Sequence, residues 1–168
     1  MSSIHADTQL EIISTRLERF TFESKKTKTW VEENSNGFVL NLFAGKTRLN
    51  LDEVRNDINP DRNADYHLDC IDFVEQWKGD MFDTIILDPP YSLRKAKEKY
   101  DGKYCTRFSL LATKIDRILK PGGKIISFGY HSTFMGYVRG YYLSKMCVFA
   151  HGGAQHCTIA IIERKRGF

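Results

Sequence analysis

Apolar residues in this chain fall into short continuous runs that alternate with stretches of helical spacing. A continuous run bounded by glycine, proline or asparagine is typical of a buried strand, and apolar residues three or four positions apart are typical of a helix. Helices are expected at residues 71–77 and 108–119, the second stopped by Pro121-Gly122-Gly123. The predicted strands are residues 38–43, 53–58, 66–68, 82–87 and 124–128, followed by an antiparallel pair at 146–150 and 158–162.

The N-terminal part of the chain has a different pattern. Residues 8–20 place four apolar side chains at helical spacing, which predicts an amphipathic helix. Residues 25–36 are polar and end in a turn at Asn36-Gly37. The four apolar side chains are Leu10, Ile13, Leu17 and Phe20.

Strands that alternate with helices, and that are apolar along nearly their whole length, predict a parallel sheet covered on both faces. Right-handed crossovers then give a doubly wound α/β fold, mostly parallel with an antiparallel last strand. We expect a single domain over residues 1–168, in which 1–36 form an N-terminal helix and covering segment and 37–168 form the core. Ligands of such sheets bind beyond the carboxyl ends of the strands. The site is therefore expected among residues 43–47, 57–59, 69–72 and 88–92.

Composition narrows the class of protein. No stretch reaches the roughly 20 apolar residues of a membrane span, and the polar N-terminus lacks the apolar core of a signal peptide, so we expect a cytoplasmic protein. The four cysteines form no CxxC pair and match no zinc spacing. His151, His156 and Cys157 are interpreted as part of a glycine-rich loop entering a strand. No metal is therefore expected.

Positive charge is concentrated in one segment. The net charge is +4, a modest excess that is compatible with a nucleic-acid partner. Six cationic residues lie between positions 94 and 107, against only Glu98 and Asp101. Such a segment suits phosphate contacts, and a solvated loop is an equal alternative. The six residues are Arg94, Lys95, Lys97, Lys99, Lys103 and Arg107.

The most unusual chemistry is offered by Asp88-Pro89-Pro90-Tyr91, directly after the predicted strand 82–87. Proline has no backbone N–H, so this turn offers carbonyl acceptors without competing donors. Asp88 adds a carboxylate acceptor, and Tyr91 adds a flat face for a base. Together these groups suit a planar ring that carries an exocyclic amine. His131, after the predicted strand 124–128, is either a contact to base or phosphate or an ordinary loop histidine.

The four residues resemble motif IV of the amino-methyltransferases, which use S-adenosylmethionine to methylate N6 of adenine or N4 of cytosine. The resemblance extends over about residues 38–165. Residues 39–45 are similar to motif I, 57–60 to the end of the family's second strand, and 68–70 to motif III. Residues 119–124 are similar to the usual entry to its fifth strand.

The resemblance implies a Rossmann-like methyltransferase and a role for each matched position. The implied catalytic residues, which would hold the amine and its base, are Asp88, Pro89, Pro90 and Tyr91. The implied S-adenosylmethionine-binding residues are Asn41, Phe43, Ala44, Gly45, Asp57, Ile58, Asp69, Cys70 and Asp88. The implied nucleic-acid-binding residues are Tyr91, the six cationic residues between 94 and 107, and His131.

Two departures from the family pattern concern the cofactor side. Motif I commonly has an acidic residue and a second glycine, where this chain has Asn41 and Lys46-Thr47. Only eleven residues separate Gly45 from Asp57, which is too few for a crossover helix with its loops and a strand. The first helix is therefore expected to be shortened or absent. Residues 28–33 are expected either to cover that face of the sheet or to serve as motif X.

The substrate is left open among several nucleic-acid bases. DPPY is more associated with N6 of adenine in DNA than with N4 of cytosine, and it also occurs in small ribosomal-RNA methyltransferases. No target-recognition domain is inserted in the matched region, so sequence choice is expected from short loops, a homodimer mate or a separate subunit.

Two other classes of protein are compatible with parts of the sequence. A non-catalytic nucleic-acid-binding subunit with the same fold is the alternative that the altered motif I suggests. The segment Gly45-Lys46-Thr47 also resembles the end of a phosphate-binding P-loop. That motif needs glycine at position 40, where the chain has Leu40, so the nucleotide-triphosphatase interpretation is disfavoured.

Overall fold

The computed structural model describes residues 7–90 and 107–167. The strands are β1 (Gln9–Ser14), β2 (Val39–Asn41), β3 (Glu53–Arg55), β4 (Phe82–Leu87), β5 (Leu119–Gly129), β6 (Tyr141–Ala150) and β7 (Thr158–Lys165). The described helices are α1 (Lys25–Asn34), α2 (Cys70–Gln76) and α4 (Phe108–Ile115). Three single 3₁₀ turns are η1 (Thr21–Glu23), η2 (Asp116–Ile118) and η3 (Tyr137–Arg139).

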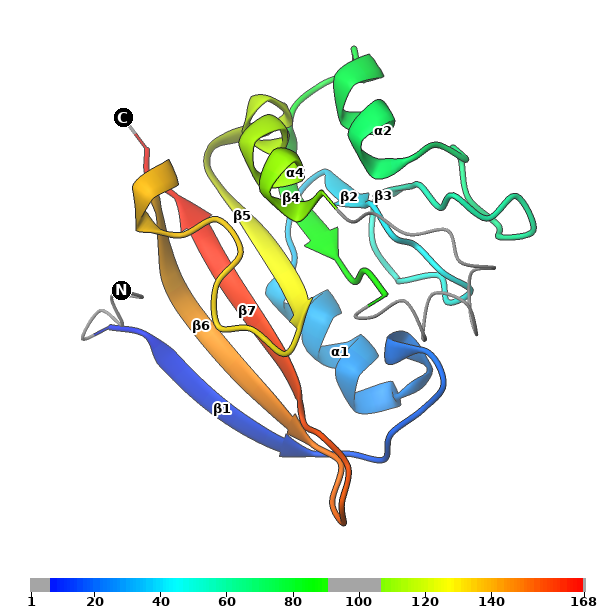
Figure 1. Cartoon of the computed structure of the whole chain (residues 1–168), viewed down its shortest axis with the longest axis vertical. Helices are drawn as coiled ribbons and strands as arrows, with labels where there is room; N and C mark the ends of the chain where they lie inside the picture. The colour runs from blue at the N-terminus through cyan, green and yellow to red at the C-terminus, as the bar shows by residue number, and fades with distance from the viewer. Residues whose placement is uncertain (1–6, 91–106, 168) are drawn as a thin grey trace.

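The strands form one seven-stranded sheet in the order β1-β6-β7-β5-β4-β2-β3 (Figure 1). Strand β7 pairs antiparallel with β5 and β6, and the other neighbouring strands pair parallel. The prediction of a mostly parallel α/β sheet with an antiparallel last strand is confirmed. The predicted strands at 82–87 and 124–128 and the closing antiparallel pair are all present. The strands predicted at 124–128, 146–150 and 158–162 are each longer than expected.

Helices cover both faces of this sheet. Successive residues of a strand point to opposite faces, and β4 shows the result. Ile85 lies in a buried cluster with Phe73 of α2 and Leu111 of α4. Ile86 lies in a second buried cluster with Trp30 of α1. The doubly wound arrangement follows from this alternation.

The prediction of a helix over residues 8–20 is wrong. The segment begins with β1, which pairs in parallel register with β6 from Gln9 opposite Lys145 to Ser14 opposite Ala150. Its Leu10 and Ile12 side chains are 66% and 71% exposed, so burial of a helical face is not what orders this segment. The backbone ladder to the edge of β6 orders it instead.

The predicted strand at 66–68 is also absent as a strand. One isolated bridge joins Asn56 to Tyr66. Beyond it, the Asn56 side chain replaces the ladder, because its Nδ2 donates to the carbonyl oxygen of Leu68 at 3.0 Å and its Oδ1 accepts from the Leu68 N–H at 3.1 Å. An asparagine amide thus satisfies the backbone groups that a neighbouring strand would otherwise pair.

No helix lies between β2 and β3, as the short spacing predicted. The face of the sheet at this place is covered by α1, whose Trp30 and Val31 are buried against Val39 of β2. Residues 28–33 therefore do cover that face. Among the residues the structure describes, no helix is long and apolar enough to cross a membrane.

Candidate active site

The carboxyl ends of β2 and β4 lie side by side at the point where the direction of chain winding changes. From β2 the chain passes outward to β3 on one side, and it then returns to β4 on the other side. The N–H of Leu42 donates to the carbonyl oxygen of Ile86 at 3.1 Å, so the residues after each strand remain adjacent. Ligands of open α/β sheets bind at such a switch point.

Gly45 forms the turn that follows β2. Its φ is +61°, a conformation that side chains strongly disfavour. No described atom lies within 4 Å of the position that a Cβ would occupy on this residue. A ligand can therefore approach the backbone here. Phe43 is partly buried and Ala44 is buried in the same turn.

Asp57 ties this turn to the segment after β3. Its side chain is only 3% exposed. Its Oδ2 accepts the N–H of Gly45 at 2.8 Å, and its Oδ1 accepts the N–H of Asn59 at 2.9 Å. A carboxylate has about four lone-pair sites, so each oxygen retains capacity for one more donor. The neighbouring Ile58 is partly buried.

Asp69 lies at the start of α2 and caps it. Its Oδ1 accepts the N–H of Ile71 at 2.8 Å. The capping role, an ordinary one for aspartate at this position, occupies one of its two oxygens. Cys70 follows as the first helical residue and is 3% exposed.

Asp88 and Pro89 directly follow β4 and are partly buried, and Pro90 is buried. Arg107 is exposed just before α4. The other predicted catalytic or nucleic-acid-binding residues of this region lie outside the described residues. They are Tyr91, Arg94, Lys95, Lys97, Lys99 and Lys103.

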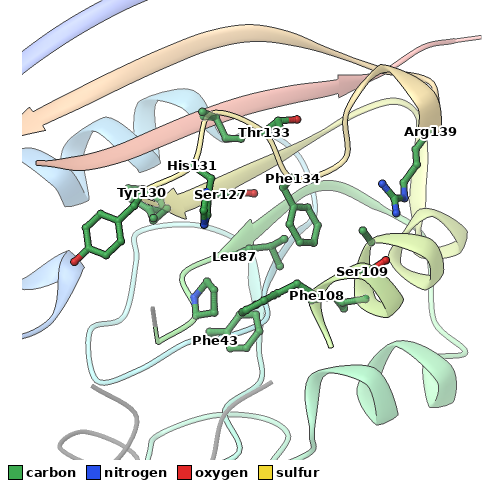
Figure 2. Close-up of a pocket in the computed structure, with 16 residues that line it drawn as sticks. Phe43, Leu87, Phe108, Ser109, Ser127, Tyr130, His131, Thr133, Phe134 and Arg139 are labelled. Carbon is green, nitrogen blue, oxygen red and sulfur yellow. The ribbon is translucent and has the colours of Figure 1, made fainter. Parts of the chain in front are cut away.

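A cavity of about 430 Å³ has Pro89 in its wall (Figure 2). Four aromatic rings from three segments line it, namely Phe43 after β2, Phe108 of α4, and Tyr130 and Phe134 between β5 and β6. Figure 2 shows Phe43, Phe108 and Phe134 grouped around Leu87 at the end of β4. His131 is exposed at the same cavity, where Ser127 and Thr133 add hydroxyl groups. Such a ring-lined space with a few polar groups suits a planar, partly polar ligand.

Tyr130 joins this cavity to a second one of about 280 Å³, because it lines both. Most residues that line the second cavity have polar side chains, among them Arg16, Glu18 and His151. The rings of Tyr130 and His156 contact edge to face with centres 6.0 Å apart. A flat side chain therefore separates the ring-lined cavity from a polar, partly cationic one.

A second concentration of positive charge lies beside the Gly45 turn. Lys46 follows Gly45, and its ammonium nitrogen is 5.0 Å from the centre of the Phe20 ring. The guanidinium groups of Arg19 and Arg62 lie 5.7 Å and 5.6 Å from the same centre. These three cations come from three segments, so no local pattern in the sequence indicates that they lie together.

A buried polar pair beneath the Gly45 turn was also not expected from the sequence. Glu53 and Arg55 lie in β3, and their side chains are 1% and 0% exposed. Arg55 Nη1 lies 2.7 Å from Glu53 Oε1. The one signal was a pattern in which two charged residues flank Val54 in a predicted strand. That pattern is equally typical of a strand with one solvent-facing side.

The residues at the end of β2 fit a cofactor of the expected kind. Gly45 leaves room for a ligand against its backbone. Asn41 is fully buried, and its Oδ1 has no hydrogen-bond partner among the described residues, although its Nδ2 donates to Glu53. A buried acceptor without a donor is costly and is satisfied when a donor binds nearby. The cradle and the acceptor together are compatible with S-adenosylmethionine.

Comparisons with known proteins agree on the fold. No protein-family model matches the chain. The structure of TrmN from Thermus thermophilus superposes with a TM-score of 0.57 at 14% sequence identity, covering 83% of this chain and 47% of TrmN. A Clostridium thermocellum protein described as an rRNA-methylase superposes with a TM-score of 0.53 at 10% identity, covering 83% of this chain and 96% of that one. The fold is that of the class I, S-adenosylmethionine-dependent methyltransferases.

One curated relative is similar in sequence. The Type II methyltransferase M.BamHI of Bacillus amyloliquefaciens is 26% identical over 132 residues, which cover 74% of this chain. The chain spans only 30% of the length of M.BamHI and about half of TrmN.

Proposed function

We propose that this protein transfers a methyl group from S-adenosylmethionine to an exocyclic amine of a nucleic-acid base, with N6 of adenine in DNA as the first candidate. The observation that carries the proposal is the adjacency of two strand ends. The Gly45 turn follows β2, and Asp88-Pro89 follows the neighbouring β4, where Pro89 borders the ring-lined cavity. A methyl donor bound at the Gly45 turn and a base bound in the ring-lined cavity would meet between these two strand ends.

The cofactor supplies an electrophilic methyl group, so the residues of the chain act on the nucleophile. An amine on an aromatic ring is a poor nucleophile because its lone pair is delocalised into the ring. The Asp88 carboxylate and the Pro89 carbonyl accept hydrogen bonds from the two N–H groups of the amine, which orients its lone pair toward the methyl group. As the N–C bond forms, positive charge grows on the nitrogen, and a fixed carboxylate stabilises this state more than the starting amine. The bond between the methyl group and sulfur breaks as the N–C bond forms, its electron pair stays on sulfur, and the methylated amine then releases its proton to water.

The target base occupies the ring-lined cavity. Phe43, Phe108 and Phe134 offer apolar contact to its faces and edges. Tyr91, which lies outside the described residues, is proposed to stack on the base as well. Removing a base from a duplex costs a few kcal/mol, and a single strand avoids much of this cost. Stacking on aromatic side chains contributes about 1–3 kcal/mol per base in return.

The choice of DNA rests on two observations. The motif Asp88 to Tyr91 is the form more associated with adenine N6, and the relative M.BamHI is a Type II methyltransferase. RNA is the second candidate, since the fold is shared with the Clostridium protein described as an rRNA-methylase. N4 of cytosine in DNA is the third.

Affinity for nucleic acid is proposed to come from cations around the site. The segment with Arg94 to Arg107 follows the catalytic turn, and Lys46 lies on its cofactor side. Phosphate contacts of this kind are independent of sequence and weaken with salt. Sequence choice is proposed to come from short loops, from a homodimer mate or from a separate specificity subunit.

The test uses purified protein with methyl-labelled S-adenosylmethionine on duplex DNA, single-stranded DNA and RNA, followed by mass spectrometry of digested nucleosides. We expect N6-methyladenine in DNA, no transfer by Asp88→Ala, and detectable cofactor binding by that variant, because the other implied cofactor-binding residues remain. Asp80→Ala, which changes an exposed aspartate before β4, is the matched control and should retain transfer.

Each other outcome contradicts part of the proposal. Label in RNA alone makes RNA the substrate, and label on cytosine changes the target atom. Full turnover by Asp88→Ala would show that the Asp88 carboxylate does not hold the amine during transfer. No transfer, together with no cofactor binding by calorimetry, favours a non-catalytic nucleic-acid-binding subunit.

A further inference from the structure

The loop that follows β2 has neither a helix nor a strand to order it, and the residues between Gly45 and β3 lack regular structure. In doubly wound folds this turn normally leads into a helix whose packing fixes its position against the ligand. Here a buried side chain occupies the place beneath the turn. Arg55 is 0% exposed, which is rare for arginine.

All five N–H donors of the Arg55 guanidinium have an acceptor. Nη2 donates to the carbonyl oxygens of Ala44 and Gly45 at 3.3 and 3.2 Å. Nη1 donates to the carbonyl of Thr47 at 3.0 Å and to Glu53 Oε1 at 2.7 Å. Nε donates to the carbonyl of Asn63 at 2.9 Å. One guanidinium therefore holds three carbonyls of the turn together with a carbonyl of the loop after β3.

Glu53 completes the support from the same strand. Its Oε1 also accepts the N–H of Leu49 at 3.1 Å, and its Oε2 accepts from Asn41 Nδ2 at 3.1 Å. From the opposite side, Glu32 of α1 accepts the N–H of Asn50 at 2.7 Å. The loop is thus fixed at several points by carboxylates and one guanidinium instead of by helical hydrogen bonds.

The direction of the peptide groups gives this arrangement a functional meaning. The C=O and N–H of a trans peptide point in opposite directions. The Ala44 carbonyl faces Arg55, and the Gly45 N–H of the same peptide faces Asp57. Arg55 and Asp57 therefore hold this peptide from its two sides. The same geometry turns the N–H of Lys46 away from Arg55. Gly45 itself is buried, but apart from its chain neighbours no described residue lies within 4 Å of its Cβ position, which leaves room for a ligand group there.

Stability alone is a weak reason for such a pair. A buried ion pair is expensive to desolvate, and apolar residues of similar volume often stabilise a protein as well or better. Apolar side chains, however, have no donors and could not form hydrogen bonds to several carbonyl oxygens of the turn. The feature that only this pair supplies is the fixed shape of the turn.

We propose that Arg55 is a positioning residue for the methyl donor, which takes over the support of the missing crossover helix by fixing the Gly45 turn in its binding shape. The inference rests on the proposed function, because it assigns S-adenosylmethionine to this turn. Arg55 does not touch the ligand and acts through the carbonyls of Ala44, Gly45 and Thr47.

The test is calorimetric titration of the full chain with S-adenosylmethionine well below its melting temperature. Arg55→Lys keeps the charge but offers three donors at a single point, which cannot span four carbonyls. The double variant Glu53→Gln with Arg55→Met removes both charges, so that no unpaired carboxylate is left buried. We expect the Kd for the cofactor to rise at least about tenfold in each, equal to about 1.4 kcal/mol. The KM for nucleic acid should stay within about twofold.

Tyr141→Phe is the matched control for a general loss of stability. It removes a part-buried hydrogen bond, from the Tyr141 hydroxyl to Asp116 Oδ1 at 2.7 Å. This bond lies at the amino end of β6, and the candidate site lies beyond the carboxyl ends of strands that run in the same direction. The melting temperature of this variant should fall while its cofactor Kd stays at the wild-type value.

Two results overturn the inference alone, provided that the wild-type protein binds S-adenosylmethionine. One is a folded Arg55 variant with wild-type affinity, and the other is failure of both variants to fold, which would make Arg55 purely structural. A wild-type protein that binds no S-adenosylmethionine overturns the proposed function, and the inference with it.

Discussion

The backbone N–H of Gly45 donates a hydrogen bond of 2.8 Å to Oδ2 of Asp57. This contact joins the turn after β2 to the segment after β3, which lie side by side because the two strands are parallel neighbours in the sheet. The other oxygen of Asp57 accepts from Asn59. Both oxygens of one buried carboxylate are thus used to order the candidate cofactor site.

Asp57→Asn should therefore destabilise the protein and weaken cofactor binding together. An asparagine has one acceptor oxygen, so its NH₂ group would face one of the two backbone N–H donors. Leaving a buried donor unsatisfied costs about 1–3 kcal/mol. Urea unfolding should show this loss in the free energy of unfolding, and calorimetry should show a higher Kd for S-adenosylmethionine. An unchanged unfolding midpoint would contradict the assigned contact.

Glu163 is expected to control the substrate side of the site. It is 2% exposed, and it fixes the connection between β5 and β6 through four hydrogen bonds of 2.8–3.0 Å. The donors are the Thr133 hydroxyl and the N–H groups of Phe134, Met135 and Gly136. Two of them line the ring-lined cavity through their side chains.

Glu163→Gln replaces one accepting oxygen by an NH₂ donor, which then faces at least one of the backbone N–H groups that this oxygen accepted from, so at least one of the four bonds is lost. We expect a higher KM for nucleic acid, a loss of about 1–3 kcal/mol in the free energy of unfolding, and an unchanged cofactor Kd. Thr133→Val removes only one bond and should have a smaller effect on KM. Equal KM values for all three proteins would show that this connection does not shape the substrate site.

Tyr130 is expected to contact the substrate strand. Its side chain is 43% exposed and lines both cavities. If a base or its neighbour stacks on this ring, Tyr130→Ala should lose about 1–3 kcal/mol of nucleic-acid affinity. Tyr130→Phe keeps the ring and should bind nearly as well as wild type. Fluorescence anisotropy with a labelled oligonucleotide measures both, and equal weakening by the two variants would point to the hydroxyl instead.

Lys124 should make stability depend on pH in the alkaline range. Burial, reinforced by the charges of Arg164 and Lys145, lowers the pKa of Lys124 from 10.5 to about 8. Arg164 is its direct cross-strand neighbour on β7. The unfolded chain therefore binds the proton more tightly than the folded one. The penalty of the buried charge is fully present below pH 8 and is relieved as the pH rises from about 8 toward 10.5.

Lys124→Met removes this group and isolates its share of the pH dependence. The variant should be more stable than wild type near pH 7, and the difference should shrink between pH 8 and 10. Urea unfolding of both proteins at several pH values tests this. A difference that stays constant over the range would show that the pKa of Lys124 is not lowered.

Local pattern was sufficient for the centre of the fold. The run from Phe82 to Leu87 is short and mostly apolar, so it predicted β4 with its observed bounds, and Asp88 was placed correctly at its end. The spacing between Gly45 and Asp57 predicted the missing helix, because so few residues cannot form a helix, its loops and a strand. The length of a segment and the spacing of its apolar residues predict its structure correctly where its own residues constrain it.

Local sequence pattern is enough to predict the class of fold, the order of most strands and the strand ends at which the candidate site lies. The strand at residues 9–14 depends on folding, because the ladder that orders it belongs to β6, far along the chain. Folding likewise makes Asn56 replace a strand and turns Arg55 inward to hold the Gly45 turn. A side chain forms such contacts with carbonyl groups brought near it by folding, and the linear pattern of apolar and polar residues does not encode where those groups will point.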